Sequence, residues 1–322
     1  MSEPIRLCGP SDVLAAIPSL LGFRPQGSVV LLALRPDGVV ACAARADLPD
    51  LRDLDEWSRS FLPAVEHSGQ VNAILAGFSV ADDDGRLAAC FAALSAVLRE
   101  RDCLVLDMIA VLGGRWRSVM CADRECCPSE GWPLETLDED FMRVRLGIRE
   151  IASDRSDLVD EIESSLESTI PPLLIEALGR LDERDRDEAI ERTTAYLLAD
   201  APHPERSAVA LRDLGDVRVR DTVLWDVVHE HPDAWSRVAE RLADVVRAAP
   251  AGHVAPAATV LAVVRWQMGD GARARIALDR ARGDNPGYGL AVLVEGMLDH
   301  GQPPWTWRAA LAELPRAACR GA

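Results

Sequence analysis

The sequence predicts a mixed α/β domain followed by an all-helical domain, and three observations support this. Apolar runs of strand length lie in the first half of the chain. Beyond about residue 154 they give way to apolar residues at helical spacing, separated by short breaks rich in proline and glycine. The length of 322 residues also exceeds that of one typical domain. We therefore expect a mixed α/β domain over residues 1–150 and an all-helical domain over residues 151–322.

The stretch Ile5–Leu48 contains a complete folding unit. Ser11 is suited to cap a helix whose apolar residues recur at helical spacing as far as Gly22. The apolar run Val29–Leu34 predicts a buried strand, because it is too short for a buried helix and rich in β-branched residues. A Pro-Asp-Gly turn then leads to a second strand at Val39–Ala46. These signals predict a helix packed on a sheet with this hairpin at its centre.

Helices and strands continue to alternate through the rest of the N-terminal half. Apolar spacing predicts one amphipathic helix over Leu51–Val65. A strand, a helix, a long strand and its partner strand are expected to follow, over Asn72–Ser79, Leu87–Arg99, Cys103–Leu112 and Arg115–Met120. Phe141–Leu146 is compatible with a last strand or with the start of the link. This order predicts a mixed sheet with helices on it.

One segment of the helical half, residues 256–288, has a more specific pattern: a helix, a Gly-Asp turn, a second helix and then Asn-Pro-Gly. Small residues at Ala258, Ala262, Ala274 and Ala281 would let two antiparallel helices approach closely. In this the segment resembles a tetratricopeptide unit, which predicts a tetratricopeptide-like helical hairpin. Because one such unit is visible and a solenoid needs about three, we expect a hairpin within a bundle.

Composition excludes several classes of function. The net charge of −17 disfavours general binding of nucleic acids and of anionic membranes. The chain contains no lysine, which removes pyridoxal-phosphate enzymes, P-loop NTPases and protein kinases. The N-terminus lacks the pattern of a secretory signal, and no apolar run approaches the length of a membrane span. We therefore expect a cytoplasmic protein.

Cys121, Cys126 and Cys127 form the one cluster among the eight cysteines. As zinc ligands they would supply at most three thiolates, so a fourth ligand such as His67 would have to come from elsewhere. Arginines nearby could instead lower the pKa of a reactive thiol. A structured turn with partly buried thiols is the third alternative, and the sequence leaves all three open. Apart from this zinc site, no cofactor is predicted.

Two further groups of residues are candidates for binding a ligand. Asp82, Asp83 and Asp84 follow a predicted strand, where ligand sites gather, and could hold a metal ion or simply form a solvated, helix-capping loop. Arg115 and Arg117 share one strand face after two glycines and could grip a carboxylate or a phosphate. They could equally be exposed charges that protect a sheet edge.

Three stretches together resemble an actinobacterial family of uncharacterised domains, the domain of unknown function numbered 4192. They are PSDVLAAIPSLLGFRPQGSVVLLAL with the following ARADLP, RWRSVMCADRECCPSEGWPL, and GDGARARIALDRARGDNPGYGLAVLVEGMLDHGQPPWTWR. The resemblance spans nearly the whole chain and implies an intracellular accessory protein of α/β plus helical build. It implies no activity, and no catalytic residue can be carried over from it.

Two functions of different classes remain open. The first is protein interaction or ligand sensing, in which the helical half binds a protein partner. Trp305 and Trp307 would anchor such a surface, since tryptophan is favoured at contacts, although both could instead pack onto the last helices. The alternative is an enzyme or a metal-binding protein with a site near the Cys121–Cys127 loop and the strand ends of the sheet.

Overall fold

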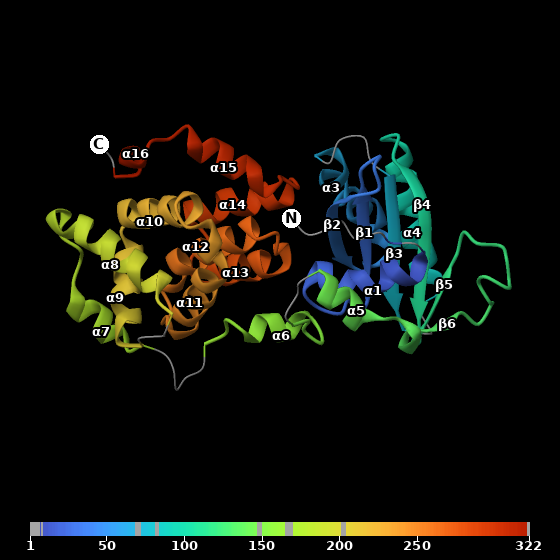
Figure 1. The fold of residues 1–322 in the computed structure, drawn as a ribbon, viewed down its shortest axis with the longest axis horizontal. Coiled ribbons are helices and arrows are strands. Elements are labelled where there is room, and N and C mark those ends of the chain that lie inside the picture. Colours follow the sequence, from blue (N-terminus) through green and yellow to red (C-terminus); the bar gives the residue numbers. More distant parts are fainter. Residues whose placement is uncertain are drawn as a thin grey trace. The chain divides into compact units, whose positions relative to one another are not determined.

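The protein consists of two compact units, Met1–Arg155 and Ser156–Ala322, and each is described by itself (Figure 1). The computed structural model describes residues 7, 9–67, 72–80, 84–146, 150–164, 170–200 and 204–320. The first unit is a six-stranded sheet with helices, and the second is built from helices, so the predicted fold class is confirmed. Among the described residues, no helix combines the length and the apolar character needed to cross a membrane.

The first helix, α1 (Pro10–Leu21), begins one residue earlier than its predicted cap. Gly9 is the N-cap residue and Pro10 is the first helical residue, so Ser11 lies inside the helix rather than capping it. Proline is well suited to this position, because its fixed φ matches the helix and its missing N–H would have had no partner there. The helix ends as predicted at Gly22, whose φ of 81° lets its N–H reach the carbonyl of Pro18 at 2.8 Å.

The sheet has the strand order β2-β1-β3-β4-β5-β6. All neighbours pair antiparallel except β3 and β4, which are parallel. The hairpin of β1 and β2 is present, but it is not at the centre of the sheet as predicted, because β2 is an edge strand. The strands are β1 (Ser28–Leu34), β2 (Val40–Asp47), β3 (Asn72–Ser79), β4 (Leu104–Leu112), β5 (Arg115–Ser118) and β6 (Trp132–Pro133).

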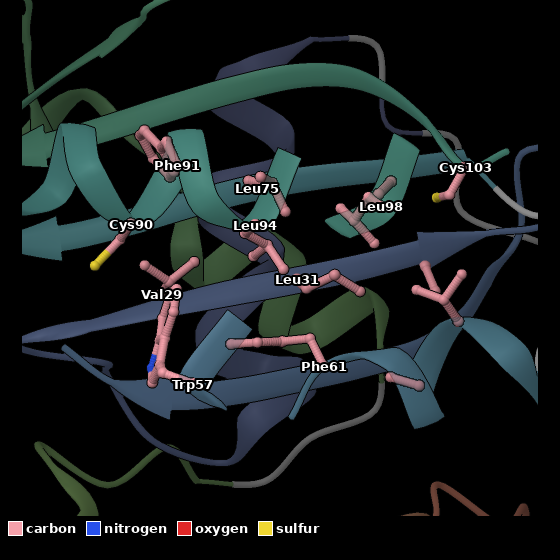
Figure 2. Close-up of a cluster of buried hydrophobic side chains, with 14 of the residues drawn as sticks. Val29, Leu31, Trp57, Phe61, Leu75, Cys90, Phe91, Leu94, Leu98 and Cys103 are labelled. Atoms are coloured by element: carbon pink, nitrogen blue, oxygen red, sulfur yellow. The ribbon is translucent and has the colours of Figure 1, made fainter. Parts of the chain in front are cut away.

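Helix α4 (Asp84–Arg99) connects the two parallel strands and packs on one face of the sheet (Figure 2). The two elements meet closely at Gly77 in β3, where an added Cβ would lie 2.2 Å from the Cδ1 atom of Leu87. Glycine therefore allows α4 to approach the sheet at this position. The core on this face comprises Val29, Leu31, Trp57, Phe61, Leu75, Cys90, Phe91, Leu94, Leu98 and Cys103, among others.

The single helix predicted over Leu51–Val65 is interrupted. A 3-10 turn (Leu51–Asp53) leads into α2 (Leu54–Arg59), and α3 (Leu62–Glu66) follows as a separate helix. The break has a physical reason at Pro63, which has no N–H to donate to the carbonyl four residues earlier and whose ring would clash with it. Phe61 remains buried at the break and packs edge-on against Trp57, with ring centroids 5.2 Å apart.

The opposite face of the sheet is also covered, because every residue of β1 is buried and successive side chains point to opposite faces. Helix α1 packs there with α5 (Glu139–Arg145), next to which it lies in Figure 1. The prediction of a strand or link at Phe141–Leu146 is therefore wrong. The Asp138 side chain accepts a 2.9 Å hydrogen bond from the N–H of Phe141 and caps the helix.

Helices joined by turns and short loops form the described part of the second unit. Helices α12 (Val254–Gln267) and α13 (Gly271–Asp284) pack on each other as a helical hairpin with its turn at Gly269, whose φ is 81°. Its likeness to a tetratricopeptide unit remains a prediction. The small residues that were expected to allow close approach, such as Ala262 and Ala274, are completely buried. The other helices are α6 (Arg155–Asp160), α7 (Pro172–Leu178), α8 (Arg186–Leu198), α9 (Pro204–Gly215), α10 (Val217–His229), α11 (Trp235–Ala248), α14 (Gly289–Asp299), α15 (Pro304–Ala312) and α16 (Arg316–Cys319).

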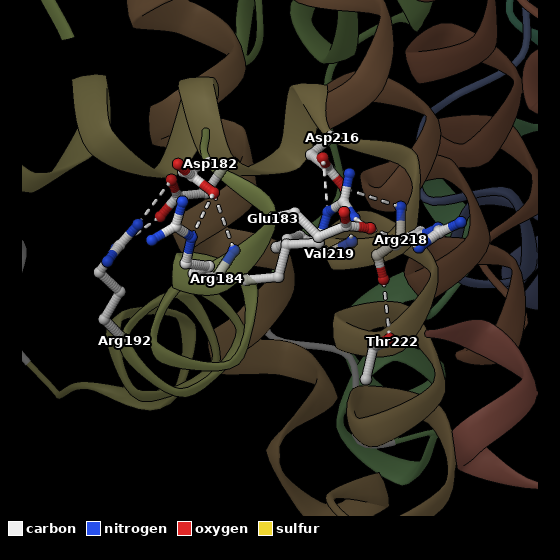
Figure 3. Close-up of polar contacts among 10 residues, drawn as sticks. Asp182, Glu183, Arg184, Arg192, Asp216, Arg218, Val219 and Thr222 are labelled. Atoms are coloured by element: carbon white, nitrogen blue, oxygen red, sulfur yellow. Dashed lines mark hydrogen bonds and ion pairs between the residues drawn. The ribbon is translucent and has the colours of Figure 1, made fainter. Parts of the chain in front are cut away.

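Ion pairs between arginine and acidic residues join the helices of this unit (Figure 3). The guanidinium of Arg186 contacts Asp216 at 3.0 Å and Glu183 at 2.7 Å, so the start of α8 is linked to the start of α10. Asp213 is completely buried and accepts hydrogen bonds from Arg192 and Arg212. A buried carboxylate of this kind needs hydrogen-bond partners. Arg192 and Arg212 provide them and so stabilise the fold.

Candidate metal-binding loop

The loop that carries the cysteines begins at the end of β5 and returns to the sheet as β6. Side chains alternate along β5, so that Trp116 and Ser118 are buried while Arg115 is exposed on the other side. Strand β6 pairs with the start of β5, opposite Arg115 and Trp116. Both ends of the loop, residues 119–131, are therefore fixed at the same short strand.

Arg115 and Arg117 hold the end of this loop through its backbone. Arg115 donates from Nε to the carbonyl of Glu130 and from Nη2 to the carbonyl of Gly131, both at 2.7 Å. Arg117 donates from Nη1 to the carbonyl of Ser129 at 3.2 Å. From the sequence, the two arginines could grip an anionic ligand or protect a sheet edge, and in the structure their guanidinium groups donate to backbone carbonyls. Binding of an anionic ligand by them remains a prediction.

Ser118 organises the start of the loop. Its hydroxyl donates to Oδ1 of Asp107 at 2.6 Å and accepts from the N–H groups of Met120 and Cys121, both at 3.2 Å. Through Ser118, the backbone N–H of Cys121 is thereby linked to Asp107 in β4.

Asp123 shapes the turn that presents the other two cysteines. Its side-chain Oδ1 accepts from the N–H groups of Glu125 at 2.9 Å and Cys126 at 3.4 Å, and its carbonyl accepts from the N–H of Cys127 at 2.8 Å. Trp132 in β6 donates from its indole Nε1 to the carbonyl of Cys126 at 2.9 Å. The bonds of Asp123 shape the turn, and the bond from Trp132 connects it to the sheet.

The three cysteine sulfurs converge as a result. The Sγ atoms of Cys121, Cys126 and Cys127 all lie within 4.8 Å of one another. Cys126 is exposed and the other two are half-buried, so the cluster is open to solvent on one side. Zinc–sulfur bonds of about 2.3 Å in a tetrahedral site place sulfurs about 3.8 Å apart. The three side chains would therefore have to draw together by at most about 1 Å to bind one ion.

Burial raises the pKa of the Cys127 thiol to about 11, and the neighbouring thiols of Cys121 and Cys126 act in the same direction. The backbone N–H of Ser118 acts against this rise, because it favours the thiolate. At neutral pH the thiol of Cys127 is therefore protonated, and an ion that binds to its sulfur must displace the proton.

A fourth ligand does not join the cluster from the described part of the chain. His67, the residue suggested from the sequence, follows α3, which packs on β2. Strand β2 is the edge strand opposite β5 and β6, so His67 lies across the sheet from the cysteines. The sequence could therefore identify the three thiols but not a fourth donor.

The three acidic candidates lie at or just before the start of α4 in the sequence. Asp82 and Asp83 lie outside the described residues, and Asp84 is the first residue of α4. Ligand binding by these three carboxylates remains a prediction.

The two tryptophans proposed for a partner surface have different environments. Trp307 is buried and packs edge-on against Trp266, with ring centroids 6.2 Å apart. Trp305, two residues earlier on α15, is 60% exposed. Trp307 therefore belongs to the core of the helical unit, whereas Trp305 is on its surface.

Reasoning from the sequence did not identify Asp123 or Trp132. An aspartate within a loop often accepts hydrogen bonds from the backbone N–H groups that follow it, and this tendency could have identified Asp123. No comparable local signal exists for Trp132, because its bond to Cys126 depends on the return of the chain to the sheet.

Comparison with known proteins identifies the family. The comparisons with curated proteins and with solved structures give no significant match. The model of one family, described as "Domain of unknown function (DUF4192)", matches residues 10–305. This match includes most of each unit and the whole cysteine loop. The chain therefore belongs to the DUF4192 family.

Proposed function

We propose that this protein binds one thiophilic metal ion, with zinc as the reference ion, through Cys121, Cys126 and Cys127. The observation that carries the proposal is the convergence of three sulfurs within 4.8 Å of one another. Thiolate is the ligand type that zinc and other soft ions select.

The surrounding contacts support the same function. Arg115, Ser118 and Trp132 hold the loop at both ends and at the turn, so little of the loop has to be ordered when the ion binds. Binding converts three thiols to thiolates, and the protons leave to solvent. With zinc, the three thiolates leave the site with one net negative charge and one coordination position for a ligand from outside the cluster.

Cobalt(II) titration of the reduced, metal-free full-length protein tests this proposal. Bound cobalt is expected to give intense thiolate-to-metal absorption with one ion per chain, and zinc is expected to displace it. Serine substitution at Cys121, Cys126 or Cys127 should weaken binding by at least about tenfold. Cys319→Ser is the matched control, since Cys319 is also half-buried but lies in the helical unit. Absence of cobalt absorption, or an equal loss in the control, would rule out the proposal.

A second candidate function is protein interaction through the helical unit, and the exposure of Trp305 favours it. Val292 and Leu293 on α14 are also about half exposed, at 46% and 55%. Apolar and aromatic side chains on a surface are favoured anchors for a protein partner.

Crosslinking and affinity capture from the host, followed by comparison of variants, tests this second candidate. Trp305→Ala should abolish capture of a specific partner. Leu173→Ala should not, although Leu173 is an even more exposed apolar side chain at 75% and lies on α7. If Trp305→Ala captures as much of the partner as Leu173→Ala does, the interaction does not depend on Trp305.

A further inference from the structure

The number of sulfur donors distinguishes among thiophilic ions. Among the described residues, no fourth histidine, cysteine or carboxylate has a ligand atom within 4.8 Å of all three thiols. Zinc prefers four ligands and would have to take its fourth from water or from another molecule. An ion that is fully bound by three sulfurs fits the set without any addition.

We propose that trivalent arsenic, taken up as arsenous acid, is the ligand that this three-thiol site binds in preference to zinc. This inference rests on the proposed function, because it requires Cys121, Cys126 and Cys127 to act as one ligand set. Trivalent arsenic forms three bonds to sulfur in a pyramid, and its lone pair occupies the remaining direction. The exposed side of the cluster at Cys126 leaves room for that lone pair, where a tetrahedral ion would need a further donor.

The atoms and charges balance in this reaction. Arsenous acid carries three hydroxyl groups, and each As–O bond is replaced by one As–S bond. The proton of each thiol leaves with the displaced hydroxide as water. Arsenic stays in the trivalent state, so no oxidant or reductant is required. Three thiols are consumed, three waters form, and the bound product is neutral.

The charge of the product also favours arsenic over zinc. Zinc with three thiolates carries one net negative charge, whereas the arsenic adduct carries none. Asp123, Arg124 and Glu125 lie between Cys121 and Cys126, so this segment carries one more negative than positive side chain. A neutral adduct avoids adding a further negative charge beside these carboxylates.

The positions of the three cysteines allow three As–S bonds rather than two. Cys126 and Cys127 are neighbours in the sequence, and Cys121 is brought to them by the turn at Asp123 and the contacts of Ser118. A chelate of three sulfurs from one preformed loop binds more tightly than any pair of the same thiols, because the third bond forms within the chain.

Native mass spectrometry of the reduced, metal-free full-length protein with sodium arsenite tests the inference. We expect one arsenic atom per chain in exchange for three hydrogens. Arsenite should also displace cobalt from the cobalt-loaded protein and abolish its thiolate-to-metal absorption. Serine at any one of the three cysteines should lower the affinity for arsenite at least about tenfold, whereas Cys319→Ser should leave it unchanged.

The outcomes separate this inference from the proposed function. If cobalt and zinc bind but an equivalent of arsenite does not displace them, the preference for arsenic is wrong and the metal site stands. If one of the three serine variants keeps full affinity, or the mass shows exchange of two hydrogens, a two-thiol site replaces the three-thiol site. If Cys8→Ser or Asp82→Asn weakens cobalt binding, a fourth donor from the chain exists and the three-coordinate inference fails. If neither cobalt nor arsenite binds, both proposals fail.

Discussion

The indole N–H of Trp132 donates a 2.9 Å hydrogen bond to the carbonyl of Cys126. Trp132 belongs to β6 and pairs with Trp116 of β5, so this bond connects the cysteine turn directly to the sheet. Ser118 of β5 connects the loop to the sheet at Cys121, and Trp132 does so at Cys126, whereas the contacts of Asp123 lie within the loop itself. The position of the sulfurs relative to the sheet therefore depends on residues that would bind no ion.

Substitution of Trp132 tests this dependence. Trp132→Phe keeps an aromatic ring but removes the N–H donor, and one such hydrogen bond contributes about 1 kcal/mol. We expect the affinity for cobalt to fall about fivefold while the number of sites stays at one. Trp305→Phe, at the exposed tryptophan of α15, is the control and should bind as the parent protein does. An unchanged affinity in Trp132→Phe would show that the bond does not position the site.

A second prediction concerns Gly131, which precedes β6. Its φ is 70°, and a Cβ added there would lie 2.7 Å from the backbone oxygen of Trp116. Gly131→Ala should therefore force β6 away from β5, at a cost of about 2–4 kcal/mol from steric conflict and the left-handed backbone together. Gly114→Ala is the matched control, because Gly114 has a φ of 79° but open space around its Cβ position. It should cost about 1 kcal/mol.

Amide hydrogen exchange over β5 and β6, together with cobalt binding, measures the difference between these two variants. Gly131→Ala should lose protection in both strands and most of its affinity for cobalt. If the two variants behave alike, the close approach to Trp116 is not what requires glycine at position 131.

The pH dependence of ion binding follows from the raised pKa of Cys127, which is about 11. Below that pH the free thiol holds its proton, so zinc binding releases the proton and becomes tighter as the pH rises toward about 11. Exchange of arsenous acid with three thiols releases no net proton. We therefore expect zinc affinity to increase between about pH 6 and about pH 8 while arsenite affinity changes little. Calorimetry in two buffers of different ionisation enthalpy counts the protons, and an equal release for both ions would contradict the expectation.

The sequence predicted elements well where one local signal acts alone, and less well where two signals compete or a distant contact decides. The run Val29–Leu34 is apolar throughout and forms the fully buried strand β1. At the start of α1, Ser11 is a good cap but Pro10 is a better first residue, and the helix begins at the proline. At Pro63 the apolar spacing continues while the backbone cannot, which divides the predicted helix in two.

The candidate site shows the same division between local and distant causes. Three cysteines within seven residues could be identified from their spacing, but the convergence of their sulfurs also depends on Ser118 and Trp132. The two arginines were correctly placed on one strand, but their use could not be predicted. Their partners are the carbonyls of residues 129–131, which reach them after the loop has turned back to the sheet.

The last prediction concerns the C-terminal end of the helical unit. Arg316 on α16 contacts both carboxylate oxygens of Asp226 on α10, at 2.5 and 2.6 Å, and the Asp226 side chain is 4% exposed. Arg316→Ala would leave this buried carboxylate without its bidentate partner, which costs several kcal/mol for a fully buried pair. Because Arg316 is itself one-third exposed, we expect a smaller loss of about 2 kcal/mol in the free energy of unfolding. Denaturation in urea, followed by circular dichroism, measures this loss.

The exposed pair of Arg52 and Asp50 provides the control for this substitution. Its two charged groups are 2.8 Å apart, but both side chains are more than half exposed. Arg52→Ala should therefore change the free energy of unfolding by less than about 0.5 kcal/mol. Asp226→Asn should lose less than Arg316→Ala, because a neutral amide can remain buried at lower cost than an unpaired charge. If Arg316→Ala is as stable as Arg52→Ala, burial of the Asp226 carboxylate does not make this pair important, and α16 is held by its apolar contacts instead.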